Sequence, residues 1–248
     1  MKLQWYKVLF MLNWDTMSNS FVIYEPEDIK IHVRRSSVNK RLSMRFTPPN
    51  KIVLSCPRKV PEVLLLKFIN QNRDWIIKIK ERMKSAIDVR VGVKIPFKGR
   101  LVEVFNSDKN FDHCIMHKNK ILVGAGAKPT GHQVRDFLIR EIALTVEPLA
   151  DKYAKILGEA YKEIKYKDTT SRWGSCNHQK CLMLSWRLIM APEKVLEYVV
   201  AHEVAHLKHM NHSANFWDAV SLLCQDYKLL RKWIKKEGST LFNYNFCI

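Results

Sequence analysis

The segment from residue 195 to residue 220 restricts the fold of this chain more than any other feature. It reads VLEYVVAHEVAHLKHMNHSANFWDAV and contains the pattern His-Glu-x-x-His at residues 202–206. Valine and leucine side chains precede the pattern at helical spacing, and Pro192 lies where a helix would begin. The segment therefore predicts a helix from about residue 192 to 209, with an apolar face against a core.

The His-Glu-x-x-His pattern gives this helix a chemical function. The i, i+4 spacing places the His202 and His206 imidazoles on one helical face, where two nitrogens can reach one metal ion. Glu203 is adjacent to the first histidine, so its carboxylate can reach a metal-bound water without being a ligand itself. The pattern predicts a metal site with Glu203 as the general base.

A catalytic zinc usually takes three protein ligands and keeps a fourth position for water. His209 and His212 are the nearest candidates for the third ligand. His209 would continue along the same helical face, whereas His212 follows Asn211, a residue that tolerates the left-handed turn with which a helix can end. We therefore expect His202, His206 and His212 to bind Zn²⁺, with His209 as the alternative third ligand.

Composition indicates a folded protein that is not embedded in a membrane. The 248 residues are 47% hydrophobic and 27% charged, which excludes disorder as the main description. No apolar run approaches the roughly 18 residues that a membrane span needs, and no signal peptide is recognisable. The six cysteines lack the spacing of a disulfide framework, which favours a reducing compartment and a cytoplasmic location.

Positive charge is concentrated in the first part of the chain. Lys and Arg number 42 against 24 Asp and Glu, and residues 1–100 alone contain 21 basic and 8 acidic side chains. Such a field attracts polyanions, including nucleic acid, phosphate esters and acidic protein surfaces. General solubility explains it equally well, so charge alone does not decide the function.

Local patterns predict a β-rich first part followed by a helical second part. Apolar and polar residues alternate on both sides of residues 36–39, which predicts an antiparallel sheet with the strand KIVLSCP at 51–57. More antiparallel strands are expected between residues 91 and 123. The remaining predicted elements are helices at about 61–85, 132–157 (ended by Gly158), 214–226 and 228–237, and strands at 163–168 and 182–189.

These elements suggest two regions and an extension. Residues 17–128 are expected to form the basic, β-rich N-terminal region with one helix, and residues 129–248 the catalytic region, with a boundary near 127–130. Residues 1–16 fit no helix or strand pattern well and are expected to be a disordered or non-native extension. Translation could start at Met1 or at Met17.

Three sequence blocks in a fixed order carry a family resemblance: RWGSC at 172–176, LSWRLIMAP at 184–192, and YVVAHEVAHLKHMNHSANFW at 198–217. Together they resemble the YgjP-like zinc metallopeptidase family, a gluzincin-type group that is distantly similar to SprT-like proteases. The resemblance is dense over about residues 165–235. The segments VRRS and CPRKV of the basic half resemble the family more loosely.

The resemblance implies an α+β fold with a zincin-like core and a β-rich, basic N-terminal half. It implies an active-site helix with His202, Glu203 and His206, and His212 from the following turn. The implied activity is zinc-dependent hydrolysis of peptide bonds in a peptide or protein substrate, by a metal-activated water with Glu203 as the base.

Three nearby features have both a functional and a structural interpretation. Residues 182–189 could be an edge strand that pairs with an extended substrate, or a plain core strand. Arg172 is a candidate substrate or transition-state contact, or a brace stacked on Trp173. Trp217 is expected to be a hydrophobic lid under the metal loop rather than a substrate contact.

Two alternative functions are open at this point. A metal-dependent nucleotide phosphohydrolase of the nucleoside triphosphate pyrophosphatase type would suit the basic field, although no acidic cluster for Mg²⁺ is recognisable. A DNA-associated SprT-like protease would use the basic half to bind nucleic acid, although no zinc-finger spacing supports it.

Overall fold

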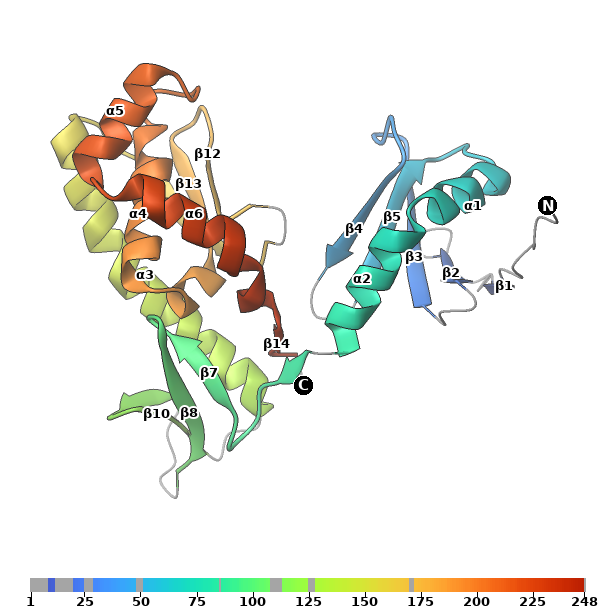
Figure 1. Ribbon diagram of the computed structural model, residues 1–248, viewed down its shortest axis with the longest axis horizontal. Coiled ribbons are helices and arrows are strands. Elements are labelled where there is room, and N and C mark those ends of the chain that lie inside the picture. Colours follow the sequence, from blue (N-terminus) through green and yellow to red (C-terminus); the bar gives the residue numbers. More distant parts are fainter. Residues whose placement is uncertain are drawn as a thin grey trace. The chain divides into compact units, whose positions relative to one another are not determined.

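The computed structural model describes residues 9–11, 20–24, 29–47, 51–84, 86–107, 113–124, 128–169 and 172–247. The chain forms two compact units, residues 1–86 and 87–248, which are described separately (Figure 1). Both units combine helices with strands, as the expected α+β class requires. No helix within the described ranges is long and apolar enough to cross a membrane.

The first unit is a five-stranded sheet with two helices. Its strands occur in the order β1-β2-β3-β5-β4. The elements are β1 (Leu9–Met11), β2 (Ser20–Tyr24), β3 (Ile29–Ser36), β4 (Ser43–Thr47), β5 (Lys51–Pro57), α1 (Glu62–Gln71) and α2 (Arg73–Lys84). Strand β1 lies within the extension expected at residues 1–16, and the other residues of that extension lie outside the described ranges.

The sheet of the first unit is mixed, which corrects the antiparallel arrangement expected from the alternation. Strands β3 and β4 do not pair with each other, because β5 lies between them. Strand β5 is parallel to β3, with Ile31 opposite Ile52, and antiparallel to β4. Alternation defines which side chains face the core, but it contains no information about the neighbouring strand.

Helices α1 and α2 cover one face of this sheet and form its core. Buried Leu65, Ile69 and Ile76 from the helices pack with buried Ile31 and Leu54 from the strands. The single helix expected at 61–85 is interrupted after residue 71, where the backbone at residue 72 leaves the helical conformation.

The second unit begins with a four-stranded sheet of order β7-β8-β10-β9. The elements up to the first long helix are β6 (Ile87–Asp88), β7 (Lys94–Phe97), β8 (Arg100–Asn106), β9 (Ile115–His117), β10 (Lys120–Val123) and α3 (Thr130–Leu157). Strand β10 is parallel to β8 and antiparallel to β9, so this sheet is also mixed. Helix α3 ends as predicted, at Gly158 in the left-handed conformation.

The division of the chain after residue 86 corrects the boundary expected near residues 127–130. Val104 and Ile121 of the four-stranded sheet belong to the same buried cluster as Phe137 and Ile142 of α3. The change from strand to helix along the sequence therefore occurs inside one core. Residues 87–128 belong to the unit that contains the His-Glu-x-x-His segment.

The remaining elements position the histidines. They are β11 (Glu163–Lys167), β12 (Gly174–Cys176), β13 (Cys181–Ser185), the 3₁₀ helix η1 (Trp186–Met190), α4 (Glu193–Ala205), α5 (Ala214–Leu223), α6 (Tyr227–Glu237), the 3₁₀ helix η2 (Gly238–Phe242) and β14 (Tyr244–Asn245). Strands β11, β13 and β12 form a sheet in that order. Helix α4 packs against α3, α5, α6 and β12 (Figure 1).

The strand expected at residues 182–189 ends at residue 185, and the next five residues form η1. Arg187 lies in η1, and its side chain is buried, with 2% of it exposed. Its guanidinium donates to both carboxylate oxygens of Asp168, at 2.7 and 3.0 Å, and to the carbonyls of Leu241 and Tyr244 at 3.0 and 3.1 Å. This side chain ties the C-terminal segment to the end of β11.

Candidate active site

Helix α4 presents the first histidine and the glutamate of the pattern. Pro192 precedes the helix, Glu193 lies in its first turn, and nine of its side chains are buried. His202 is half-buried, and Glu203 is only 5% exposed. The helix is therefore surrounded by the core on most sides, and His202 lies on the part of its surface that remains open.

Helix α4 ends at Ala205, earlier than the expected residue 209, and His206 is the residue that ends it. The His206 imidazole donates from Nδ1 to the carbonyl oxygen of His209, at 3.0 Å. Because a carbonyl can only accept, this bond places the proton on Nδ1 and leaves the lone pair of Nε2 free. His209 thus contributes its backbone to the site, and it does not continue the helical face as expected.

His212 comes from the loop between α4 and α5. Its Nε2 lies 3.1 Å from the Nε2 of His202. The left-handed turn expected at Asn211 is absent, since the described non-glycine residues with positive φ are three lysines elsewhere in the chain. Asn211 instead accepts, through its side-chain oxygen, a hydrogen bond from the backbone of Ser213 at 3.3 Å. That bond shapes the loop just before α5.

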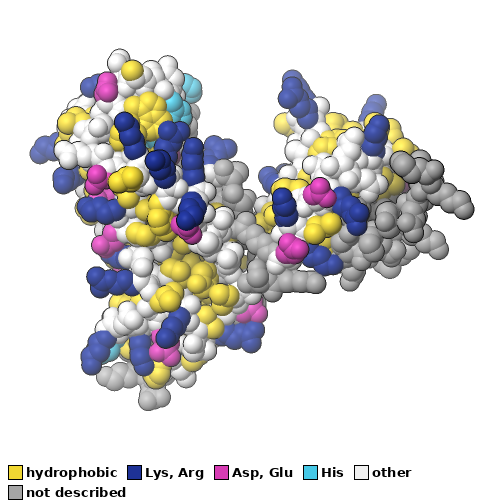
Figure 2. All heavy atoms as spheres, viewed as in Figure 1, with side chains coloured by type: hydrophobic (Ala, Val, Ile, Leu, Met, Phe, Trp, Pro, Cys, Tyr) yellow, Lys and Arg dark blue, Asp and Glu magenta, His cyan; other side chains and the backbone are white. Residues whose placement is uncertain are grey.

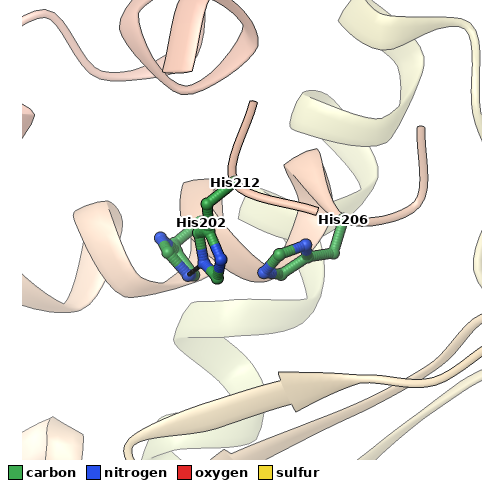
Figure 3. Close-up of side chains that lie close together, drawn as sticks. All are labelled: His202, His206 and His212. Atoms are coloured by element: carbon green, nitrogen blue, oxygen red, sulfur yellow. Dashed lines mark hydrogen bonds between the residues drawn. The ribbon is translucent and has the colours of Figure 1, made fainter. Parts of the chain in front are cut away.

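The three expected ligands come together, as Figure 3 shows. One candidate ligand atom from each of His202, His206 and His212 lies within 4.8 Å of the others. Zinc–nitrogen bonds of about 2.0–2.1 Å place tetrahedral ligand nitrogens about 3.3 Å apart, close to the distance between His202 and His212. The donor set therefore fits a zinc ion, with His206 as the third ligand.

Burial favours the neutral forms of His202 and His206, and a neutral imidazole is the form that binds a metal. Burial, followed by the charges of His206 and His212, lowers the pKa of His202 to about 3, and Arg231 adds to the effect. Burial also lowers the pKa of His206, although the hydrogen bond to His209 opposes this. The Nδ1 atom of His202 is buried without a hydrogen-bond partner in the described structure.

Aromatic rings enclose the histidines on the α5 side. Phe216 is fully buried, and its ring centre lies 4.5–4.9 Å from those of the three histidines. Trp217 lies 5.7 Å from His212 and stacks on Tyr227 at 5.4 Å. The Trp217 ring is half-buried, a position consistent with the expected hydrophobic lid. These rings cover the histidines on one side and limit the movement of the imidazoles.

Glu203 is packed directly against strand β12. A Cβ atom at Gly174 would lie 2.6 Å from Cδ of Glu203, so only glycine leaves room for this side chain. Burial raises the pKa of Glu203 to about 8, and the positive charge of Arg172 partly opposes the increase. The sequence did not indicate that Gly174 makes room for Glu203, because the two residues belong to different elements.

The edge strand beside α4 is β12, so of the two interpretations of residues 182–189 the structure supports the core strand and not the substrate-pairing edge strand. Strand β13, which contains the first part of that segment, lies in the centre of its sheet, between β11 and β12. The backbone edge next to the histidines therefore belongs to the RWGSC segment. A five-residue strand with alternating burial gave no indication of whether it would be central or at an edge.

Arg172 lies next to this edge and is exposed. Its charge acts on Glu203, and it borders a hollow of about 490 Å³ together with Lys165, Lys167 and Ser175. Trp173 packs against Phe242, with ring centres 5.0 Å apart. The described structure contains no stacking contact between Arg172 and Trp173 of the kind expected for a brace.

Arg231 of α6 is a site residue that the sequence did not indicate. Its guanidinium carbon lies 4.7 Å from the centre of the Trp217 ring. The helix contains several exposed lysines, so one basic residue among them carries no distinguishing signal. Only the packing of α6 against α4 brings this arginine to the histidines.

Comparison with known proteins identifies the family. The family model of the YgjP-like metallopeptidase domain matches residues 40–237. The chain belongs to the YgjP-like metallopeptidase family. It is a peptidase, and peptides or proteins are its substrates. The match begins at residue 40, so it includes the second part of the basic first unit as well as most of the second unit.

Two solved structures resemble part of this YgjP-like peptidase. One is the metallopeptidase zymogen abylysin of Pyrococcus abyssi, with 22% identity, 38% of this chain and 95% of that chain covered, and a TM-score of 0.34. The other is the metallopeptidase zymogen jannalysin of Methanocaldococcus jannaschii, which is 22% identical. The match covers 37% of this chain and 95% of that chain, with a TM-score of 0.31. No curated protein matches the chain. The comparisons lend no support to the nucleic-acid module considered as an alternative.

Proposed function

We propose that the chain is a zinc-dependent peptidase in which His202, His206 and His212 hold the metal and Glu203 is the general base. The observation that carries the proposal is the convergence of one nitrogen from each histidine within 4.8 Å, beside a buried carboxylate. When bound, zinc would polarise the scissile carbonyl and lower the pKa of water.

The donor set favours zinc over a hard cation. Three neutral imidazoles suit a borderline metal, whereas Mg²⁺ is held mainly by carboxylate oxygens. The hydrogen bond from His206 to the carbonyl of His209 orients that ring and leaves its other nitrogen toward the metal. The same argument weighs against the nucleotide phosphohydrolase considered as an alternative.

Glu203 is held where a general base is required. Its position in the helix next to His202, and its packing against Gly174, fix the carboxylate beside the proposed metal position. From there a carboxylate oxygen can take the proton of the attacking water and pass it to the nitrogen of the leaving amine. Arg172, whose charge acts on Glu203, is proposed as a contact for substrate or for negative charge that develops in the transition state.

The edge of β12 is proposed to bind the substrate backbone. The strand pairs with β13 on one side only. An extended peptide can therefore add to its free edge through main-chain hydrogen bonds, with its scissile bond close to α4. We also propose a cytoplasmic location, since all six cysteines are free and such thiols suit a reducing compartment.

The decisive experiment compares the zinc-loaded wild type with Glu203→Gln, each incubated with a mixed peptide library and nucleoside triphosphates. Mass spectrometry reads the products, and metal content is measured on the same samples. We expect peptide products from the wild type, none from Glu203→Gln, and one equivalent of zinc in both. Glu197→Gln is the matched control, because Glu197 lies on the same helix and pairs with Lys194 at the surface.

Two results would contradict the proposal. Peptide cleavage that persists in Glu203→Gln would exclude Glu203 as the base. Cleaved nucleotides alongside intact peptides would favour nucleotide hydrolysis over peptide hydrolysis as the activity of the site.

A further inference from the structure

Arg231 provides a cation at the entrance to the proposed active site. Its guanidinium lies over the Trp217 ring, 4.7 Å from the centre, and that ring lies 5.7 Å from His212 and 5.8 Å from His202. These contacts place the positive charge within about two or three residues of extended peptide from the histidines, at about 3.4 Å per residue. A substrate side chain two or three residues from the metal site is therefore within reach of Arg231.

The guanidinium has no anionic partner within the part of the chain that the structure describes. Arg231 is exposed, and no described carboxylate lies within ion-pair distance of it. The one acidic residue of α6, Glu237, pairs with Lys236 at 3.3 Å. Figure 2 shows Lys and Arg side chains gathered near histidine on this face of the unit, with few Asp or Glu among them.

The contact with Trp217 holds the Arg231 guanidinium in a position where it can bind a carboxylate. The guanidinium carbon lies 4.7 Å from the centre of the Trp217 ring, a cation–π contact that limits the positions the side chain adopts. The N–H groups at the edge of the guanidinium remain free, and their fork geometry matches the two oxygens of a carboxylate. A single oriented arginine beside the catalytic residues fits one acidic side chain better than it fits a nucleic-acid backbone, which requires several cations along a path.

We propose that Arg231 is a specificity determinant that binds an acidic side chain of the substrate close to the scissile bond. The proposal rests on the proposed peptidase function and adds a substrate class to it. Charge-assisted bonds of this kind correspond to a preference of about tenfold or more for Glu over Gln at the recognised position.

Paired peptides test the proposal. Each pair is identical except for Glu or Gln at one of three positions on either side of the cleaved bond, and kcat/KM is measured for both members. In the wild type we expect about a tenfold preference for Glu at one position or more. Arg231→Gln should remove the preference, and Arg231→Glu should replace it with a preference for Lys.

Lys236→Gln is the matched control, because it removes one positive charge from the same helix away from Trp217 and should retain the preference for Glu. Equal kcat/KM for the Glu and Gln peptides in the wild type would overturn the proposal, and so would a preference that survives in Arg231→Gln.

A binding measurement separates this proposal from the proposed function. Fluorescence anisotropy of labelled Glu and Gln peptides with the zinc-loaded Glu203→Gln protein gives the same comparison without turnover. Absent cleavage by the wild type refutes the peptidase mechanism, whereas equal affinity for the two peptides refutes the acidic subsite. Tighter binding of a single-stranded oligonucleotide, lost in Arg231→Gln, would assign the arginine to nucleic acid and overturn the proposal.

Discussion

Gly174→Ala tests whether the packing of β12 against Glu203 positions the proposed general base. A methyl group at this position would lie 2.5 Å from Cγ and 2.6 Å from Cδ of Glu203, whereas ordinary contacts are 3.4–4 Å. The glutamate therefore has to move by about 1 Å, and a catalytic group misplaced by that distance loses about a hundredfold in rate. The overpacked site should also lower the free energy of unfolding by about 1–3 kcal/mol.

The assay measures kcat, zinc content and the urea midpoint of unfolding for wild type, Gly174→Ala and Ser175→Ala. Ser175 is the neighbouring residue of the same strand and borders the hollow near Arg172, so its substitution should leave Glu203 in place. We expect the alanine at 174 to lower kcat about a hundredfold while zinc stays bound, because the histidines are not displaced. Wild-type kcat in Gly174→Ala with zinc bound would refute the reasoning.

Two further predictions concern the third ligand and the buried arginine. Zinc at about 100 times its Kd should stabilise the wild type by about 2.7 kcal/mol in thermal unfolding. His212→Ala should lose most of this stabilisation by zinc. His209→Ala should keep it, because the hydrogen bond from His206 uses the backbone carbonyl of residue 209. Stabilisation that is kept in His212→Ala and lost in His209→Ala would exclude His212 as a ligand. Arg187→Met should lower the free energy of unfolding by about 2–4 kcal/mol, since four hydrogen bonds are lost. A urea midpoint that does not change would show that the bonds to Asp168 and the C-terminal segment contribute nothing.

Local sequence patterns predicted the features of the fold that depend on a single helix or strand. The i, i+4 spacing of His202 and His206 and the apolar flank predicted the helix and the shared ligand face. Pro129 and Gly158 limit α3 close to the predicted ends, because proline and glycine act on the backbone at their own positions. The α+β class and the proximity of His212 followed from the order of such elements and from the family resemblance.

Sequence alone did not determine features that depend on which elements pack together. Alternation in β3 and β5 shows one buried face, yet the parallel pairing between them is decided by the whole sheet. The position at which α4 ends also depends on contacts beyond the helix. His206 donates a hydrogen bond to the carbonyl of His209 in the following loop, and helical spacing in the sequence does not show this contact.

The site itself combines both kinds of information. The sequence by itself indicated the proposed chemical groups, three histidines and a glutamate, because their spacing along one helix and the following loop is a local property. Tertiary structure decided their environment: Gly174 against Glu203, Trp217 over the histidines and Arg231 over Trp217. These contacts join residues distant in sequence, and they form only because burial of the apolar faces of α4, α5 and α6 brings those elements together.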